Sequence, residues 1–403
     1  MRAFLKGVIL PVLFLLLCSL AILFGADIIL TQTLPPWRDS IGNTNHTEKI
    51  TGRYLTGQSA SRQDTLLIFG SSELRTTEIS THPVNFFAGK REGFQVDIIG
   101  RGSCQSIIHA IQLAASGDSL RGKKVVLITS PQSYVEEGIA PDLFMANFSA
   151  QQYLELLRDE ELSDEVKGYL SGRVAELMKE YRSLPESASV DPALSALAEW
   201  ETKHDFPSAA GKFLMTPYYT LSRYLYSLKD KFSARNILAG GENIPAPVFR
   251  SAIDWQAEEQ SAVAEAEKMT SNNGFGMLDD YYTTYIGSRL ERQKDRDRAL
   301  SYSVSKEYGD LRILFEICRQ KGIEPLFIHV PLHGQWSDYT GFSADRRQEY
   351  YQNVREIAEE YSIQTLDLTG YEYDQYFMCD VMHLGWKGWL EVDKALIEYY
   401  YSM

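Results

Sequence analysis

The chain has 403 residues, of which 44% are hydrophobic and 23% charged, and its 40 Lys plus Arg against 54 Asp plus Glu leave a net charge of −14. This apolar share is close to the globular average, which excludes a wholly disordered chain. The negative charge disfavours a protein that follows nucleic-acid phosphates, because such binding depends on Lys and Arg.

The N-terminal segment predicts a membrane anchor. Residues 7–26 form an uncharged apolar run, and a helix rising about 1.5 Å per residue over that length matches a hydrocarbon layer of roughly 30 Å. Arg2 and Lys6 precede the run and Asp27 follows it, so the positive-inside rule places residues 1–6 in the cytoplasm and everything after Asp27 outside the cell. A cleaved signal peptide is the alternative, but its apolar stretch is usually only about 7–15 residues.

Beyond the anchor, the chain alternates strand and helix patterns. Residues 27–63 are polar, which is typical of a linker or irregular lead-in. Five later runs have the length and apolar content of strands covered on both faces: residues 65–69, 96–99, 125–129, 325–330 and 365–368. Helical patterns separate or follow them at residues 104–115, 310–322, 343–361 and 389–400. We therefore expect an α/β fold with a central parallel sheet and helices on both faces.

Two helical segments allow more specific predictions. For the helical pattern that precedes the fourth strand, Asp310 is a possible N-cap and Gly322 a possible C-terminal stop. Between about residues 141 and 300 strand signals fade, which predicts a large helical insertion between the third and fourth strands. Within it, Tyr218, Leu221, Leu225 and Leu228 share one helical face. Such a stripe could touch a membrane or a partner, but we expect it to form the core of the insertion.

Two motifs at opposite ends of the chain carry candidate chemistry. Ser72 follows the first strand, at the sheet edge where α/β proteins place their ligand sites. Asp380 and His383 precede the last helix with a spacing that lets the carboxylate hold imidazole Nδ1–H and leaves Nε2 as a base. A Ser hydroxyl needs such a base to become a nucleophile. A helix-capping Ser and a solvent-facing His are the structural alternatives.

These motifs resemble those of the SGNH (GDSL-like) hydrolase superfamily, whose first block is Gly-Asp-Ser and whose last is Asp-x-x-His. Gly70-Ser71-Ser72 matches the first block with Ser in place of Asp, and Asp380 and His383 match the last. The chain resembles the DltD family, the D-alanyl transfer proteins of teichoic-acid D-alanylation, still more closely. The matching segments, in that family's order, are residues 69–74, 100–106, 130–132, 336–341 and 380–386.

The resemblance implies an SGNH-like three-layer α/β/α domain at residues 64–403 with catalytic Ser72, Asp380 and His383. The superfamily's second and third blocks supply a Gly amide and an Asn side chain to the oxyanion. Near those places this chain has Gly102, Gln105 and Gln132, which are therefore candidate oxyanion or substrate-positioning residues.

The implied function is that of a membrane-anchored extracellular acyltransferase. It would carry D-alanine through an acyl-serine onto hydroxyls of lipoteichoic acid. No Walker-type phosphate loop or dinucleotide fingerprint is present in the sequence, so we expect no cofactor and an acyl group that arrives activated. The implied partners are the membrane-bound O-acyltransferase of the same pathway and the D-alanyl carrier protein or an intermediate acyl carrier.

Two alternatives to an acyltransferase remain open. A thioesterase or esterase that hydrolyses D-alanyl donors would use the same three residues. A non-catalytic scaffold that recruits the carrier protein would need none of them.

The remaining reactive residue types favour structural roles. His329 and His333 are four residues apart, but Pro331 and the preceding strand pattern deny them the helical geometry of a zinc site, and we expect no metal. His109 lies in an apolar helical pattern and is expected to be a core histidine. Cys104 and Cys379 are expected to fill small apolar gaps rather than to act as nucleophiles.

Overall fold

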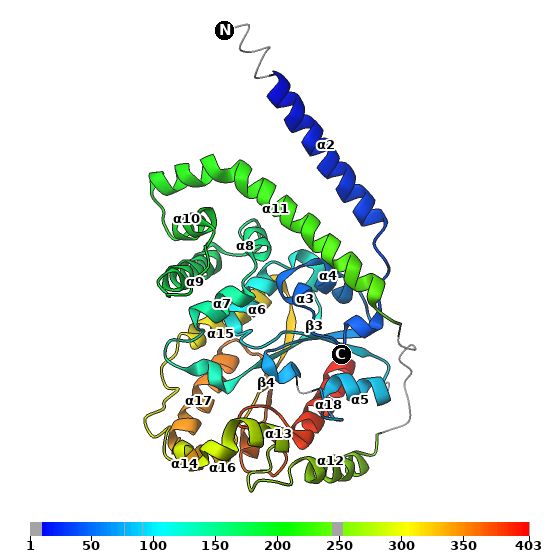
Figure 1. The fold of residues 1–403 in the computed structure, drawn as a ribbon, viewed down its shortest axis with the longest axis vertical. Coiled ribbons are helices and arrows are strands. Elements are labelled where there is room, and N and C mark those ends of the chain that lie inside the picture. The colour runs from blue at the N-terminus through cyan, green and yellow to red at the C-terminus, as the bar shows by residue number, and fades with distance from the viewer. Residues whose placement is uncertain (1–9, 76, 91, 244–252, 403) are drawn as a thin grey trace.

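Five strands form one parallel sheet in the order β2-β1-β3-β4-β5 (Figure 1). The computed structural model describes residues 10–75, 77–90, 92–243 and 253–402. The strands are β1 (Thr65–Phe69), β2 (Gln95–Ile99), β3 (Lys124–Thr129), β4 (Glu324–His329) and β5 (Gln364–Asp367). Each overlaps a predicted strand, because buried parallel strands consist of short, nearly continuous apolar runs.

Helices cover both faces of the sheet. Side chains alternate along each strand, so Leu67 and Phe69 pack into one hydrophobic core while Leu66 and Ile68 pack into another. The first core contains α6 (Ser106–Ala114), α15 (Glu307–Lys321) and α17 (Ala344–Glu360), and the second contains α5 (Pro83–Lys90), α12 (Trp255–Met269) and α18 (Trp386–Tyr401). The expected α/β architecture is confirmed.

Helices also fill the segment between β3 and β4. Its elements before α12 are η5 (Pro131–Tyr134), α7 (Pro141–Asn147), α8 (Ala150–Leu156), α9 (Asp164–Arg182), α10 (Pro192–Glu201) and α11 (Phe206–Gly240). After α12 come α13 (Asp279–Tyr281), η6 (Tyr282–Ile286), η7 (Gly287–Arg289) and α14 (Leu290–Gln293). The shorter elements elsewhere are η2 (Asp39–Ile41), η3 (Ser72–Arg75), η4 (Gly117–Leu120), α16 (Gly334–Thr340) and η8 (Thr369–Tyr371).

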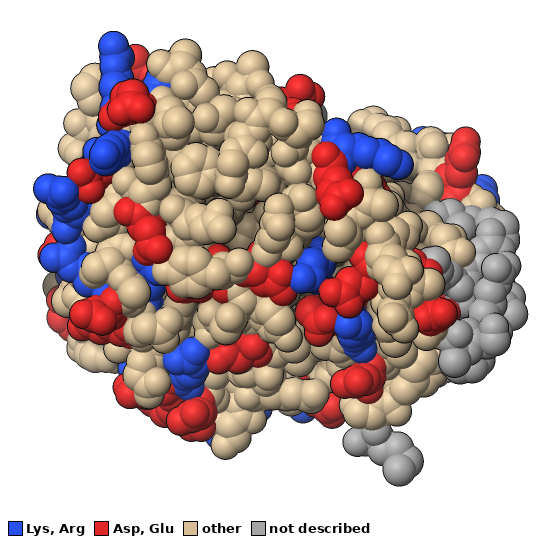
Figure 2. All heavy atoms as spheres, turned by 90° about the horizontal axis from the view of Figure 1, so that it is seen from below, with Lys and Arg blue, Asp and Glu red and all other residues tan. Residues whose placement is uncertain are grey.

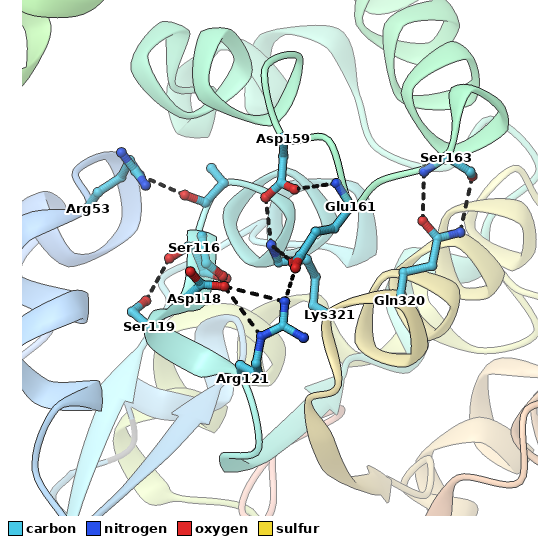
Figure 3. A network of polar contacts seen from close by, with 12 residues as sticks. Arg53, Ser116, Asp118, Ser119, Arg121, Asp159, Glu161, Ser163, Gln320 and Lys321 are labelled. Carbon is cyan, nitrogen blue, oxygen red and sulfur yellow. Dashed lines mark hydrogen bonds and ion pairs between the residues drawn. The ribbon is translucent and has the colours of Figure 1, made fainter.

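A polar network fastens the start of α9 to α15, a helix that packs on one face of the sheet, as Figure 3 shows. Lys321, at the end of α15, is almost fully buried and pairs with Asp159 at 2.6 Å and Glu161 at 3.0 Å. Ser163 caps α9 and exchanges two hydrogen bonds with Gln320: its N–H donates to Oε1 at 2.8 Å, and Nε2 donates to its hydroxyl at 3.1 Å. The start of α9 is therefore held against the end of α15.

The N-terminal segment contains α2 (Leu10–Gln32), and residues 7–9 of the predicted anchor lie outside the described residues. Within the described part of the chain, none of the helices combines the length and the apolar composition that crossing a membrane requires. The expected irregular lead-in at 27–63 is partly helical, because α3 (Thr47–Thr51) and α4 (Tyr54–Ala60) bury apolar side chains such as Ile50 and Leu55.

Two predictions about helices were wrong. Asp310 does not cap α15, which begins at Glu307; instead Asp310 is buried inside the helix and accepts from Nε and Nη2 of Arg173 at 3.1 Å each. Gly322 does end this helix, in the left-handed conformation with a φ of 62°. The stripe on α11 is not a core: Tyr218, Leu221 and Leu225 are each more than 40% exposed, and Leu228 is half-buried.

A buried ion pair joins the lead-in to the sheet. Lys49 on α3 and Asp97 on β2 have fully buried side chains, and Nζ lies 2.6 Å from Oδ1. The same ammonium donates to the carbonyls of Ile41 at 2.9 Å and Gly42 at 3.2 Å. Burial lowers the pKa of Lys49, and the charge of Asp97 opposes that effect. Removal of one partner would leave the other charge buried without its counter-ion.

We expect Lys49→Met to lower the free energy of unfolding by roughly 3–5 kcal/mol, the usual cost of stranding one half of a buried pair. Chemical denaturation of the full chain in detergent, followed by tryptophan fluorescence, measures it. Arg319→Met is the control, because Arg319 pairs with Glu316 on the surface and such pairs contribute at most about 1 kcal/mol. Equal losses in the two variants would contradict the importance of the buried pair.

Candidate active site

Ser72 lies directly beyond the carboxyl end of β1, at the start of the short helix η3. The turn Gly70-Ser71-Ser72 leaves the sheet beside the end of β2, where the Gly70 N–H donates to the carbonyl of Ile99 at 3.1 Å. Ser72 is half-buried. The strand thus delivers its hydroxyl to the edge where parallel sheets present ligand sites.

Gly100 allows the loops after β1 and β2 to touch. A Cβ added at this position would lie 1.8 Å from the carbonyl oxygen of Gly70, a distance that no side chain can occupy. The same oxygen accepts a hydrogen bond from Nε2 of His109 at 3.1 Å. Burial lowers the pKa of His109 to about 4, so its ring is neutral and Nε2 carries the proton toward the carbonyl. His109 is thus the buried histidine that was expected, and it supports the turn of Ser72.

Asp380 and His383 lie on a tight loop before α18. An isolated bridge between Met378 and Leu384 closes the loop, and the Cys379 N–H donates to the carbonyl of His383 at 3.0 Å. Asp380 Oδ1 accepts from the N–H groups of Met382 and His383, both at 2.9 Å. These bonds fix the carboxylate, which leaves Oδ2 to face the imidazole.

The structure brings the three predicted residues into one hydrogen-bonded chain. His383 Nδ1 lies 2.6 Å from Asp380 Oδ2, and His383 Nε2 lies 2.8 Å from Ser72 Oγ. Because a carboxylate can only accept, Nδ1 carries a proton toward Asp380, and a neutral ring then offers Nε2 as the acceptor for the Ser72 hydroxyl. This is the arrangement in which a histidine can take the proton of an attacking serine.

The electrostatic surroundings favour the protonated form of His383. Burial by itself lowers the pKa of this residue, but the hydrogen bond and the charge of Asp380, followed by Glu73 and Glu78, outweigh burial and raise the pKa above its usual value. An imidazolium formed during proton transfer would therefore be stabilised in place.

Glu73 is a buried acid next to Ser72 that sequence reasoning did not single out as functional. Its carboxylate accepts a hydrogen bond from the N–H of Ser71, which braces the nucleophile turn. Burial raises the pKa of Glu73, while the hydrogen bonds from the Ser71 and Glu73 backbones and the charge of His383 oppose the rise. Its position directly after Ser72 was the available signal, but adjacency in sequence does not reveal burial.

The loop after β2 is held in a strained shape beside the nucleophile turn. Asn147 clamps it, because its Oδ1 accepts from Arg101 Nε at 2.6 Å and its Nδ2 donates to the carbonyl of Gly102 at 3.2 Å. Ser103 has a φ of 67°, which is uncommon for a residue with a side chain and is often found near functional sites. The Ser71 hydroxyl donates to the Arg101 carbonyl at 3.3 Å, which connects the two loops.

The three predicted oxyanion residues differ in their surroundings. Gly102 faces open space, and within the described residues its N–H makes no hydrogen bond. Gln105 precedes α6 with its Oε1 buried and unpaired among the described atoms, whereas Gln132 is exposed in η5. In the described part of the chain no hydrogen bond joins these residues to Ser72 or His383. Their assignment stays a prediction.

The other histidine and cysteine side chains considered as reactive are hydrogen-bonded or buried. His333 caps α16, with Nδ1 accepting from the Trp336 N–H at 3.3 Å and Nε2 lying 2.9 Å from the carbonyl of Phe275. Burial raises the pKa of Cys104 to about 11 and that of Cys379 well above its usual value, so neither thiol is poised to ionise. Across the described residues, no group of three His, Cys, Asp or Glu side chains could hold a metal ion.

Comparison with known proteins finds the same family in a family model and in three relatives. A family model described as "DltD protein" matches residues 42–401. "Protein DltD" of Bacillus subtilis (strain 168) is 32% identical over 352 residues, which cover 87% of this chain and 86% of that protein. Proteins of the same name from Staphylococcus aureus (strain NCTC 8325 / PS 47) and Lacticaseibacillus rhamnosus are each 25% identical, over 82% and 81% of this chain and 80% and 75% of their own lengths.

Asp380→Asn should lower the pKa of His383, because burial then acts without the opposing carboxylate. The pH at which Ser72 reaches half of its maximal reactivity should therefore fall, and the maximal rate should drop by roughly 10²–10⁴-fold. The measurement is the rate of labelling by a fluorophosphonate between about pH 5 and pH 9. Asp345→Asn, on the exposed start of α17, is the control. An unchanged or higher midpoint in Asp380→Asn would contradict this account of His383.

Gly100→Ala should abolish labelling of Ser72, because the new methyl group must displace the Gly70 carbonyl and the turn behind it. Gly89→Ala is the matched control, since its Cβ would meet nothing within 4 Å. Far-ultraviolet circular dichroism separates local displacement from unfolding. If folded Gly100→Ala labels at the wild-type rate, the close contact is not needed to position Ser72.

Proposed function

The chain belongs to the DltD family, which is involved in the D-alanylation of teichoic acids, and we propose that it is a serine-dependent acyltransferase that moves D-alanine onto hydroxyl groups of lipoteichoic acid. The observation that carries this proposal is the hydrogen-bonded chain Ser72–His383–Asp380. The same three residues occupy the positions implied by the SGNH-like motifs.

The proposed reaction has two steps, acylation of Ser72 and transfer of the acyl group to the acceptor. Ser72 Oγ attacks the carbonyl carbon of an activated D-alanyl group while His383 Nε2 takes its proton; the leaving group departs with that proton and an acyl-Ser72 ester remains. A polyol hydroxyl of the acceptor then attacks the ester, His383 again takes and returns the proton, and Ser72 is regenerated. Asp380 keeps the imidazole oriented and stabilises its charged form in both steps.

Two features support recognition of a D-alanyl group. Among the described residues the N–H of Gly102 makes no hydrogen bond, and it lies in the loop beside the Ser72 turn, so we assign it to the oxyanion in the transition state, with Gln105 and Gln132 as further candidates. Acidic groups surround His383, since Glu73, Glu78 and Asp380 all raise its pKa. The same negative potential would attract the ammonium of D-alanine, an effect that salt should weaken.

The proposed location is the outer face of the cell membrane. Residues 7–26 would anchor the chain with residues 1–6 in the cytoplasm, as the uncharged run and the preceding Arg2 and Lys6 indicate. Because the sequence has no Walker-type loop for ATP, the acyl group must arrive activated. The proposed suppliers are the membrane-bound O-acyltransferase of the pathway and its D-alanyl carrier protein or an intermediate acyl carrier.

In cells that lack this protein, wild-type chain should restore D-alanine esters on lipoteichoic acid, whereas Ser72→Ala and His383→Ala should restore almost none. Ser71→Ala is the neighbouring control: it removes one hydrogen bond of 3.3 Å to the Arg101 carbonyl but keeps the proposed nucleophile, so it should restore most of the esters. Mass spectrometry after fluorophosphonate treatment of the purified full chain should find the label on Ser72. Restoration by both Ser72→Ala and His383→Ala would sink the enzymatic proposal and favour a scaffold. Release of free D-alanine in the presence of the acceptor would favour hydrolysis over transfer.

A further inference from the structure

Helix α11 presents an apolar stripe on the side that faces away from the protein. Six large apolar side chains recur along it at helical spacing with 42–78% of their surfaces exposed: Phe213, Leu214, Tyr218, Leu221, Leu225 and Phe232. A helix on the surface of a water-soluble domain normally places such a stripe against the core. Isolated exposed apolar residues need no explanation, but a continuous stripe marks a surface that contacts something.

The opposite side of α11 faces the protein and makes both apolar and polar contacts. Tyr219 and Tyr226 pack against the main hydrophobic core, and Ala234 and Leu238 are buried against the lead-in. Lys212 pairs with Glu201 at 3.2 Å, and Arg223 pairs with Glu155 at 3.1 Å. Further along, Asp230 is buried and accepts from the backbone N–H groups of Arg53 and Tyr54 at 2.8 and 3.0 Å. The helix is therefore held to the domain by apolar packing as well as by charges and hydrogen bonds, and its second apolar stripe remains outward.

The charge of α11 differs in sign from that of the whole chain. Within Phe206–Gly240 there are five basic residues, Lys212, Arg223, Lys229, Lys231 and Arg235, and one acidic residue, Asp230. The chain carries −14 overall. Figure 2, which views the molecule from the side away from α11, shows acidic and basic side chains interspersed. A basic helix with an aromatic, apolar outer side is the pattern of helices that lie on anionic membranes.

α11 also adjoins α2, the helix that contains most of the proposed anchor (Figure 1). The Tyr224 hydroxyl donates to the carbonyl of Leu23 at 3.1 Å. Lys231 Nζ lies 2.7 Å from Asp27 Oδ1 and donates to Thr31 Oγ1 at 3.0 Å. Asp27 is the first charge after the apolar run, so these contacts place α11 beside the level at which the anchor would leave the lipid.

We infer that the apolar stripe of α11 contacts the bilayer beside α2, with its side chains among the acyl chains and with the exposed Lys229 and Arg235 near anionic headgroups. This inference rests on the proposed membrane anchoring and extends it from one point of attachment to a second. Two contacts would fix the orientation of the catalytic domain over the membrane, whereas a tether alone would let it rotate.

A second copy of the chain fits this side of α11 less well than lipid does. A symmetric pair would place the same patch of each copy against the other. Exposed Lys229 and Arg235 would then approach their counterparts, and like charges oppose such a contact. Anionic lipid headgroups neutralise those charges and accept the Tyr and Phe rings at the interface.

Spin labels can test the depth of α11 in the full chain, reconstituted in vesicles of phosphatidylglycerol and phosphatidylcholine. In a Cys18→Ser background, the label is placed at Leu221→Cys on the stripe or at Val304→Cys, a control position that is 66% exposed and lies outside α11. The remaining native cysteines are buried. The ratio of relaxation by oxygen to relaxation by a water-soluble nickel chelate should be several-fold higher at 221 than at 304.

The possible outcomes distinguish lipid, water and protein as the surroundings of the α11 stripe. Equal ratios at 221 and 304 would mean that the stripe faces water, and protection of 221 from both reagents would mean that protein covers it; either result overturns the inference. A separate sample of the wild-type chain, labelled at native Cys18, reports on the anchor. If Cys18 lies in lipid while position 221 lies in water, the α11 contact is refuted and the anchor is not. Ser72 labelling in the same vesicles tests the proposed chemistry independently of both.

The charges of α11 give a second test. Lys229→Glu combined with Arg235→Glu should lower the ratio at 221 in anionic vesicles and leave it unchanged in pure phosphatidylcholine. No difference between wild type and variant in anionic vesicles would contradict the role assigned to the headgroups.

Discussion

The hydrogen bond between Ser72 and His383 joins the two ends of the fold, and the candidate chemistry depends on it. Ser72 follows the first strand and His383 lies on the loop before the last helix, so the bond joins residues 311 positions apart and forms only when these two segments are folded against each other. Neighbouring supports hold each side: Glu73 and His109 fix the serine turn, and Asp380 fixes the imidazole. A serine and a histidine at one sheet edge become a reactive pair because their backbones cannot drift apart.

Much of this arrangement followed from sequence pattern, for identifiable reasons. Buried parallel strands are short apolar runs, and the carboxyl ends of such strands share an edge, so the meeting of Ser72 with Asp380 and His383 could be predicted from their places in the chain. Asp310 shows where local rules fail: the residue has the chemistry of a helix cap, but Arg173 from a distant helix draws it into the interior. The exposed stripe of α11 shows another limit, since periodicity identifies an apolar side without telling what covers it.

The interior of the protein holds several charges in place of apolar contacts. Lys49 with Asp97, Arg173 with Asp310 and Arg347 with Glu372 are all buried pairs. Such pairs contribute little net stability relative to apolar packing, yet each is satisfied in one geometry only. Here they connect the lead-in, the insertion and the C-terminal segment to their neighbours, so they specify how the added segments dock on a sheet that apolar packing already stabilises.

The exposed apolar stripe of α11 bears on how the protein behaves once it is removed from the cell. A chain cut after residue 26 loses the apolar run but keeps the aromatic stripe, which extends along most of a 35-residue helix. Such a truncated product still has a detergent-binding surface. Without lipid that stripe would face water, and a mild detergent below the amount needed to dissolve membranes should be enough to cover it.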